Sequence, residues 1–264
     1  MNNNYKVIVA HPDDEIIFFS SVLKNASKII ICFDQTEDLN VNIGRQKLKT
    51  QMPLNNFLFL GQVESAVSNS ANWKYPEKCL EGIVVRKNKN SYLQNYLDLK
   101  LQLSKIINYG ETIYTHNPWG EYGHEEHIQV FRVIMALSID LKLKIFVNNY
   151  VSNKSYRLMT MEQHLLSDEI HINTPDIDLA STLKKIYQST SCWTFHDHYT
   201  WPKTELFYKI ITDKNYTKSI NLKTSSPPLN VLSGNYKTTL LKKIVGKILP
   251  TNMKIMLKRL LGLS

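Results

Sequence analysis

Two short stretches of the sequence hold the residue types that bind divalent metals and transfer protons. Residues 11–15 are His-Pro-Asp-Asp-Glu, and residues 124–127 are His-Glu-Glu-His. Imidazoles and carboxylates are typical ligands of catalytic Zn²⁺, which takes about three protein ligands and leaves one position for water. Water activated in this way is a nucleophile at neutral pH. The two stretches therefore predict a hydrolytic metal site if the fold brings them together.

The spacing within each stretch separates metal binding from proton transfer. His11 and Asp14 are three residues apart, close enough to bind one ion together. Asp13 and Asp14 diverge by about 100° on a helix, so one can bind the metal while the other meets its water. His124 and His127 share a helical face, so one can bind metal and the other can face substrate. Each stretch alone also fits a structural role, because carboxylates commonly cap helices.

Buried strands and amphipathic helices alternate along the first 213 residues. The expected strands cover residues 5–10, 27–34, 55–61, 112–116, 143–148 and 206–211. The expected helices cover residues 13–25, 44–52, 93–108, 124–141 and 176–189, and residues 62–91 are expected to form an irregular loop. This alternation predicts an α/β fold with a mostly parallel sheet covered on both faces. Both stretches then follow strands at the edge of the sheet where ligands bind.

The sequence Ala-His-Pro-Asp-Asp-Glu after the first strand, with Tyr-Gly-His-x-x-His later, resembles the LmbE/PIG-L-like zinc-dependent de-N-acetylases. The resemblance spans residues 5 to about 130 and continues weakly at 185–187 and 205–207. It implies a Rossmann-like three-layer α/β sandwich. It also implies Zn²⁺ held by His11, Asp14 and His127, although this donor set also accepts other divalent ions such as Fe²⁺.

The same resemblance implies roles for residues around the metal. Asp13 matches the general base, and His124 matches the histidine that assists at the scissile amide. Tyr122 matches a tyrosine that polarises the carbonyl in some members. Arg45 lies where the family often has a substrate-contacting arginine in an R-x-x-E stretch, although the fourth residue here is Leu48.

Aromatic and acidic residues give further predictions about the site. Trp119, just ahead of the second stretch, is expected to line the pocket. Residues 192–201 (CWTFHDHYTW) can form a wall that stacks on a sugar, or can pack as an aromatic core cluster. Glu15, Glu125 and Glu126 are expected beside the metal ligands or in solvent, with Glu15 able to orient a ligand.

Composition excludes several classes of protein. The chain of 264 residues is 43% hydrophobic and 21% charged, values of an ordinary globular protein with a full core. Its three cysteines form no CxxC and cannot all pair, which favours a reducing compartment and predicts a cytoplasmic protein. No apolar run approaches the ~18–20 residues of a membrane span, and the N-terminus does not resemble a signal peptide.

The net charge of +9 lies in the C-terminal part of the chain. Residues 214–264 carry ten Lys and Arg and no Asp or Glu, which leaves residues 1–213 at −1. Together with the resemblance, which implies a deacetylase domain, this charge distribution predicts such a domain over 1–213, a linker over 214–235 and a basic amphipathic helical tail over 236–264. Because the body is neutral, nucleic-acid binding is not expected.

The tail contains two cationic amphipathic segments, 239–249 and 252–263, on either side of Pro250. Such segments are typical of an in-plane anchor on an anionic membrane surface, here the cytoplasmic face. Their apolar faces can instead pack on the body or on another subunit. The sequence leaves the oligomeric state open.

The resemblance predicts a hydrolase that removes acetyl from an N-acetylated amino sugar. A tail bound to a membrane would favour a lipid-linked substrate or one from surface glycan biosynthesis, and a nucleotide-linked sugar is also compatible. Two alternatives stay open: an amidase acting on a different sugar-linked amide, and a non-catalytic, membrane-associated metal-binding module. Asp13, next to the predicted ligand Asp14, disfavours the binding module, because a protein that only binds metal needs no general base.

Overall fold

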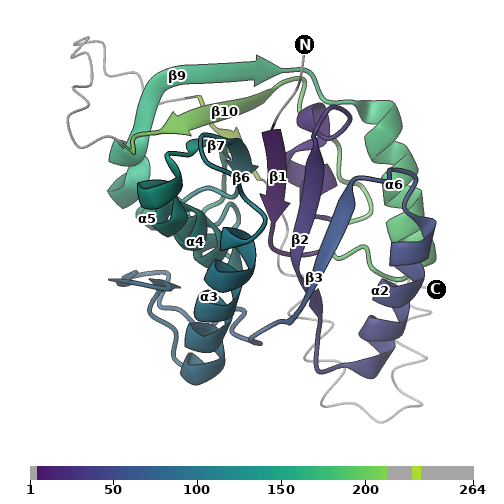
Figure 1. Cartoon of the computed structure of the whole chain (residues 1–264), viewed down its shortest axis with the longest axis horizontal. Helices are drawn as coiled ribbons and strands as arrows, with labels where there is room; N and C mark the ends of the chain where they lie inside the picture. Colours follow the sequence, from purple (N-terminus) through teal and green to yellow (C-terminus); the bar gives the residue numbers. More distant parts are fainter. Residues whose placement is uncertain (1–4, 213–227, 233–264) are drawn as a thin grey trace, which may run out of the picture. The chain divides into compact units, whose positions relative to one another are not determined.

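A seven-stranded sheet with the order β3-β2-β1-β6-β7-β10-β9 forms the centre of the computed structural model (Figure 1). The structure describes residues 5–212 and 228–232. The strands of the sheet are β1 (Tyr5–Val9), β2 (Lys28–Gln35), β3 (Phe57–Val63), β6 (Thr112–Thr115), β7 (Lys144–Asn148), β9 (Leu166–Asn173) and β10 (Glu205–Ile210). The first five in spatial order pair in parallel, whereas β10 pairs antiparallel with both β7 and β9. The predicted α/β class with a mostly parallel sheet is confirmed.

Helices cover both faces of the sheet. They are α1 (Asp14–Phe18), α2 (Leu39–Gln51), α3 (Lys89–Ser104), α4 (Glu125–Leu141), α5 (Tyr156–Glu162) and α6 (Ile177–Ser189). The helices α3 and α4 pack together on one face, and α1 and α2 pack with α6 on the other (Figure 1). The larger apolar core lies between the sheet and the α3–α4 layer, where residues such as Ile8, Leu99 and Phe131 are completely buried.

Some elements differ from the sequence predictions. The helix expected over 13–25 is only α1, because the backbone leaves the helical conformation at Phe19 (φ −138°, ψ 17°), whose ring stacks on Phe207. A 3₁₀ turn over Ser20–Val22 follows, held by hydrogen bonds from Ser20 and Ser21 to the buried Glu205 carboxylate. The sequence also gave no indication of β9 or α5. The loop expected over 62–91 contains a small hairpin of β4 (Lys78–Cys79) and β5 (Gly82–Ile83).

Two short strands lie outside the main sheet and include part of the predicted linker. β8 (Tyr150–Val151) pairs in parallel with β11 (Asn230–Val231), so residues 230–231 contact the body of the protein. The predicted tail over 236–264 lies outside the described residues, and its membrane binding stays a prediction. Among the described residues, no helix is both long and apolar enough to cross a membrane.

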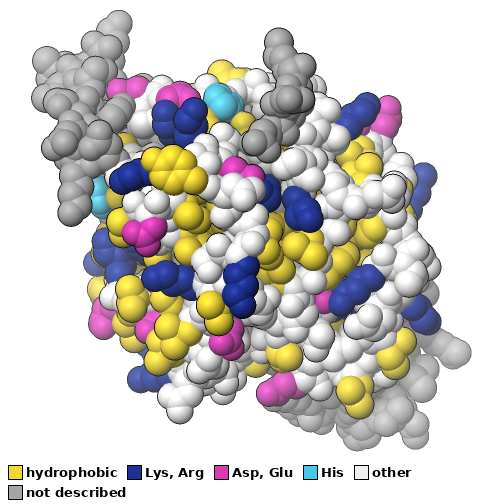
Figure 2. Space-filling model, in the orientation of Figure 1, with side chains coloured by type: hydrophobic (Ala, Val, Ile, Leu, Met, Phe, Trp, Pro, Cys, Tyr) yellow, Lys and Arg dark blue, Asp and Glu magenta, His cyan; other side chains and the backbone are white. Residues whose placement is uncertain are grey.

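The strand order reverses at β1: β2 and β3 follow on one side of it, and β6 and β7 on the other. This switch point between β1 and β6 determines where the site lies. β1 pairs with β2 on one side and with β6 on the other. A parallel sheet leaves a crevice at such a switch point, outside the carboxyl ends of the two strands. The loop after β1 and the loop between β6 and α4 both begin at this edge, so they meet there. On the face shown in Figure 2, Lys and Arg side chains are interspersed with acidic and apolar ones, in keeping with the near-neutral body.

Candidate metal centre and active site

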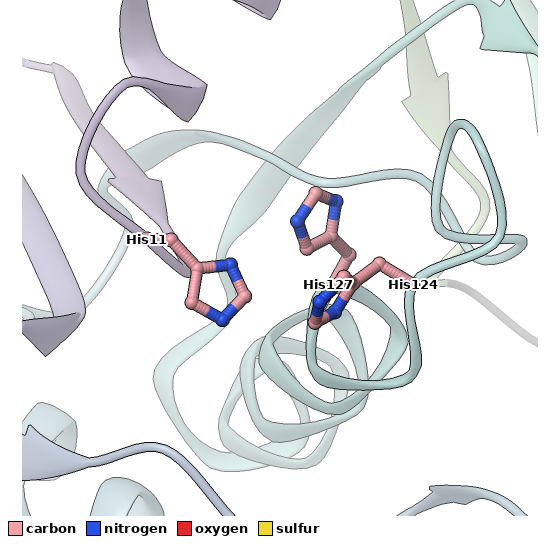
Figure 3. Close-up of side chains that lie close together, drawn as sticks. All are labelled: His11, His124 and His127. Carbon is pink, nitrogen blue, oxygen red and sulfur yellow. The ribbon is translucent and has the colours of Figure 1, made fainter. Parts of the chain in front are cut away.

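Three imidazoles from the two predicted stretches gather where the β1–α1 loop faces the start of α4 (Figure 3). Donor atoms of His11, His124 and His127 all lie within 4.8 Å of one another. A second set, Asp14 with His116 and His127, meets the same criterion. The fold therefore brings together residues that are more than a hundred positions apart in the sequence.

Imidazole nitrogens of two of these histidines lie close to one carboxylate oxygen, Oδ2 of Asp14. Asp14 Oδ2 lies 3.3 Å from His11 Nδ1 and 3.2 Å from His127 Nε2. It also accepts the backbone N–H of His11 at 2.8 Å. Burial raises the pKa of Asp14, but His127 and the other imidazoles around it outweigh that effect and hold the pKa well below its usual range. Asp14 is therefore a carboxylate anion with imidazole nitrogens around it.

Two glutamates fix which nitrogen each imidazole presents to Asp14. His127 Nδ1 lies 2.7 Å from Glu121 Oε2, and His11 Nε2 lies 2.9 Å from Glu126 Oε2. Each ring donates its proton to the glutamate, so the opposite nitrogen carries a lone pair toward Asp14. His127 Nε2 is buried and, among the described residues, makes no hydrogen bond.

This arrangement fits a divalent cation. Ligands at ~2.0–2.1 Å from one tetrahedral ion are separated by about 3.3–3.4 Å, close to the spacing of the His11, Asp14 and His127 donors. An unpartnered, buried imidazole nitrogen is unfavourable in the folded chain and is satisfied by a metal. The donor set and its carboxylate–histidine pairs thus match a metal site.

His116 contacts the same centre but is not placed to be a ligand. Its Nε2 accepts the backbone N–H of Ala10 at 2.8 Å, which occupies the lone pair nearest Asp14. Its Nδ1 faces Glu121 Oε2 at 3.1 Å, and its ring stacks on His127 at 3.9 Å. His116 therefore positions both His127 and the end of β1.

Asp13 lies beside this centre with one oxygen held in place. Its Oδ2 accepts hydrogen bonds from Thr194 N at 2.6 Å and Thr194 Oγ1 at 2.8 Å. Burial, followed by the neighbouring charge of Asp14, raises the pKa of Asp13 to about 8. A carboxylate with a raised pKa is suited to accept a proton near neutral pH.

The backbone at Asp13 is in the left-handed region, with φ of 88°, which is unfavourable for a residue with a side chain. Glu15 supports this turn, because its Oε2 accepts the Asp13 N–H at 3.2 Å. The other oxygen of Glu15 accepts from the Tyr187 hydroxyl of α6 at 2.5 Å. Glu15 therefore holds the turn that separates the Asp13 and Asp14 carboxylates.

His124 is the N-cap of α4, and this role fixes its proton. Its Nδ1 accepts the N–H of Glu126 at 3.3 Å, so the neutral ring carries hydrogen on Nε2. Burial, together with the charges of His11 and His127, holds the pKa of His124 well below its ordinary value. The ring of Tyr122 lies 5.8 Å from that of His124 and 5.2 Å from that of His127. His124 is thus a neutral hydrogen-bond donor at the site.

The two predicted substrate contacts are both buried, and the structure contradicts one of them, Trp119. Trp119 is 0% exposed and belongs to the core, where its indole N–H donates to Tyr150 O at 2.7 Å. No face of this ring is available to a sugar. Arg45 is also buried, and its guanidinium forms an ion pair with Glu64 at 2.5 Å. Because Glu64 lies near His11, this ion pair adjoins the site, and a contact between Arg45 and substrate stays a prediction.

Several residues of the site were missed at the sequence level. His116 ends the predicted strand 112–116, and this position is a signal that could have been used. Glu121 and Thr194 had no such signal, because each acts through contacts between distant segments. Residues 192–201 do reach the site, but through Thr194, whereas Tyr199 and Trp201 donate to backbone carbonyls of α1.

Replacing Glu121 with Gln should weaken metal binding about 10–100-fold, the usual effect of losing a carboxylate behind a metal-bound histidine. The variant removes the charge that orients His127 and His116. Competition with a fluorescent chelator measures the affinity. Glu162→Gln is a matched control, since Glu162 is equally buried but pairs with Lys78 and Arg132. Equal affinities of the two variants would contradict the orienting role.

The metal-free protein should lose stability as the pH rises from 5 to 9. Burial raises the pKa of Asp13 and of Glu15 to about 8. Both carboxyl groups bind protons more tightly in the folded chain than in the unfolded one, so their contribution is lost as pH rises through these values. A loss of ~2 kcal/mol lowers Tm by about 4–8 °C.

Thermal unfolding in a chelator at pH 6 and pH 9 measures this effect, and Asp13→Asn should reduce it. A metal-free Tm that is unchanged or higher at pH 9 would show that these groups are not proton-binding in the folded state.

Comparison with known proteins agrees with this architecture. Teicoplanin deacetylase Orf2, solved in a zinc-inhibited form, matches with a TM-score of 0.50 and 7% identity over 80% of this chain and 100% of that chain. The chain shares the fold of that enzyme. A deacetylase–teicoplanin complex matches with a TM-score of 0.46 and 7% identity over 78% of this chain and 98% of that one.

Sequence comparison gives less information. No family model matches the chain. An uncharacterised protein of Acanthamoeba polyphaga mimivirus is 27% identical over an alignment of 149 residues, which covers 52% of this chain. The matched region spans 60% of the length of that relative.

Proposed function

We propose that this protein is a metal-dependent hydrolase of the LmbE/PIG-L-like kind that removes the acetyl group from an N-acetylated amino sugar. The observation that carries the proposal is the convergence of His11 Nδ1, Asp14 Oδ2 and His127 Nε2 beside the Asp13 carboxylate. A non-catalytic metal-binding module would need only the three donors. The separately held second carboxylate favours an enzyme.

His11, Asp14 and His127 would hold the cation. When bound there, a divalent metal supplies a Lewis acid that favours hydrolysis of an amide. Glu121 and Glu126 keep the two imidazoles in the tautomers that present a lone pair to the cation. Zn²⁺ is the expected ion, and Fe²⁺ is the alternative for this donor set.

Asp13 is the proton acceptor of the proposed reaction. Thr194 fixes Oδ2, so Oδ1 is the oxygen that takes a proton from the attacking water as the new C–O bond forms. The same group can return this proton to the amine nitrogen when the C–N bond breaks. The products are acetate and a free amine.

His124 stabilises the charge that develops on the carbonyl oxygen. Its neutral ring donates from Nε2 because Nδ1 is occupied as the α4 N-cap. Donors fixed before the reaction stabilise an oxyanion without reorganisation, and removing one such donor typically slows turnover about 10²–10³-fold. Tyr122, whose ring adjoins His124, is the second candidate for this role.

The amino-sugar substrate is supported by the motif resemblance and by the fold shared with a teicoplanin deacetylase. An acetate-release screen over free, phosphorylated, nucleotide-linked and lipid-linked N-acetyl sugars tests it, with metal content measured in parallel. Both Zn²⁺ and Fe²⁺ should be titrated to sub- and super-stoichiometric levels. Cleavage of other sugar-linked amides without acetate release would favour the amidase alternative. Metal binding without any hydrolysis would contradict the proposal.

A further inference from the structure

A lysine on the segment between β8 and α5 reaches the loop that carries the catalytic histidine. Lys154 Nζ donates to the Gly123 carbonyl, the residue directly before His124, and to Asn69 Oδ1 at 2.8 Å. The ammonium also lies over the ring of Trp73, 4.7 Å from its centroid. Lys154 and Trp73 are both partly exposed, so solvent reaches this pair beside the loop that carries His124.

The backbone is shaped to admit this side chain. Gly123 has φ of +87°, and a Cβ at this position would lie 2.9 Å from Cγ and Cδ of Lys154. Any larger residue would therefore collide with the lysine stem. The ring of Trp73 is fixed in turn, because its indole N–H donates to Glu125 Oε1 in the first turn of α4 at 3.2 Å. The cation is thus held in a defined place.

The charge on Lys154 is balanced only in part by the groups that hold it. Its direct partners are two neutral oxygens and an aromatic ring. The nearby carboxylate of Glu125 accepts instead from Asn69 N, Ala71 N and Trp73 Nε1. Burial lowers the pKa of Lys154. A partly desolvated cation of this kind gains from an anion.

We infer that Lys154, beside Trp73, binds an anionic group carried by the substrate close to its acetamido group. Two of the three N–H donors of the Lys154 ammonium are used by Gly123 and Asn69, which leaves one for a ligand. A phosphate or a carboxylate oxygen can accept that hydrogen bond. The identity of the substrate rests on the proposed function. Anion binding itself requires no turnover, so the two can be tested separately.

Calorimetric titration of the metal-loaded full chain, in an Asp13→Asn background that prevents turnover, tests the inference. The probes are N-acetylglucosamine 1-phosphate, N-acetylmuramic acid as the carboxylate form, and neutral N-acetylglucosamine. Hydrogen bonds to charged groups are worth ~1.5–3 kcal/mol. Lys154→Met should therefore lower the affinity for the anionic probe that binds more tightly by about tenfold or more. Affinity for the neutral sugar should change less than about twofold. Lys154→Arg should retain most of the anion affinity, which separates loss of charge from loss of folding.

Lys184→Met provides a matched control. Lys184 likewise donates to two carbonyl oxygens and lies over aromatic rings, but on α6. It should leave the affinity for every probe unchanged. The inference is overturned if Lys154→Met weakens neutral and anionic probes equally, or if neither anion binds the parent chain more tightly than the neutral sugar. Anion selectivity without acetate release from any sugar would overturn the proposed function alone.

Discussion

Replacing His127 with Ala is expected to leave a folded chain that neither retains the metal nor hydrolyses substrate. His127 Nε2 is a buried nitrogen that makes no hydrogen bond within the described part of the chain, and its loss removes one of the three proposed ligands. Metal catalysis contributes several kcal/mol to lowering the barrier, so kcat/KM should fall by about 10³-fold or more. Elemental analysis after dialysis gives the metal content, and circular dichroism reports the fold.

A pair of variants distinguishes the two possible ligand sets. His11→Ala should empty the site in the same way, whereas His116→Asn should retain metal, because His116 Nε2 is used by the Ala10 N–H. If His116→Asn loses the metal and His11→Ala keeps it, the cation is held by Asp14, His116 and His127, and the assignment made above is wrong.

Replacing Asp13 with Asn is expected to separate chemistry from metal binding. The amide keeps the shape of the side chain, and its oxygen can still accept from Thr194, but it cannot take a proton. General-base catalysis typically contributes ~10²–10⁴-fold, so kcat should fall within that range while KM changes little. Metal stoichiometry should remain at the wild-type value.

Two results would contradict this role for Asp13. Loss of the metal in Asp13→Asn would identify Asp13 as a ligand, and full activity would show that another group takes the proton. Thr194→Val serves as an intermediate case, because it removes one hydrogen bond to Asp13 and keeps the backbone one. Its rate should lie between those of wild type and Asp13→Asn.

The central sheet was predictable because its strands are buried on both faces. Strands such as β1 and β2 are continuous apolar runs, since helices cover both sides of a parallel sheet. β9 gave no such signal, because it lies at the edge of the sheet and half of its residues are exposed, including Ile172 at 64%. The end of α1 at Phe19 depends on packing against β10, which local sequence does not encode.

The candidate metal ligands could be proposed from the sequence because each lies in a short, chemically unusual stretch at the end of a strand. The residues that orient them were not, since their roles depend on contacts across the fold. Glu121 has no distinctive neighbours in the sequence, yet it contacts His116, His127 and Asn148. Trp119 shows the opposite error: proximity in sequence to the second stretch suggested a pocket residue, but its large apolar ring is buried in the core.

The hydrogen bonds from Thr194 to Asp13 join two residues that are 181 positions apart in the sequence. All three candidate ligands have been synthesised once the chain reaches residue 127, but the segment that immobilises the base follows almost seventy residues later. During synthesis from the N-terminus, the ability to capture a cation can therefore arise before the ability to use it. The hydrogen bonds that fix Asp13 form only after α6 and the segment that follows it have docked.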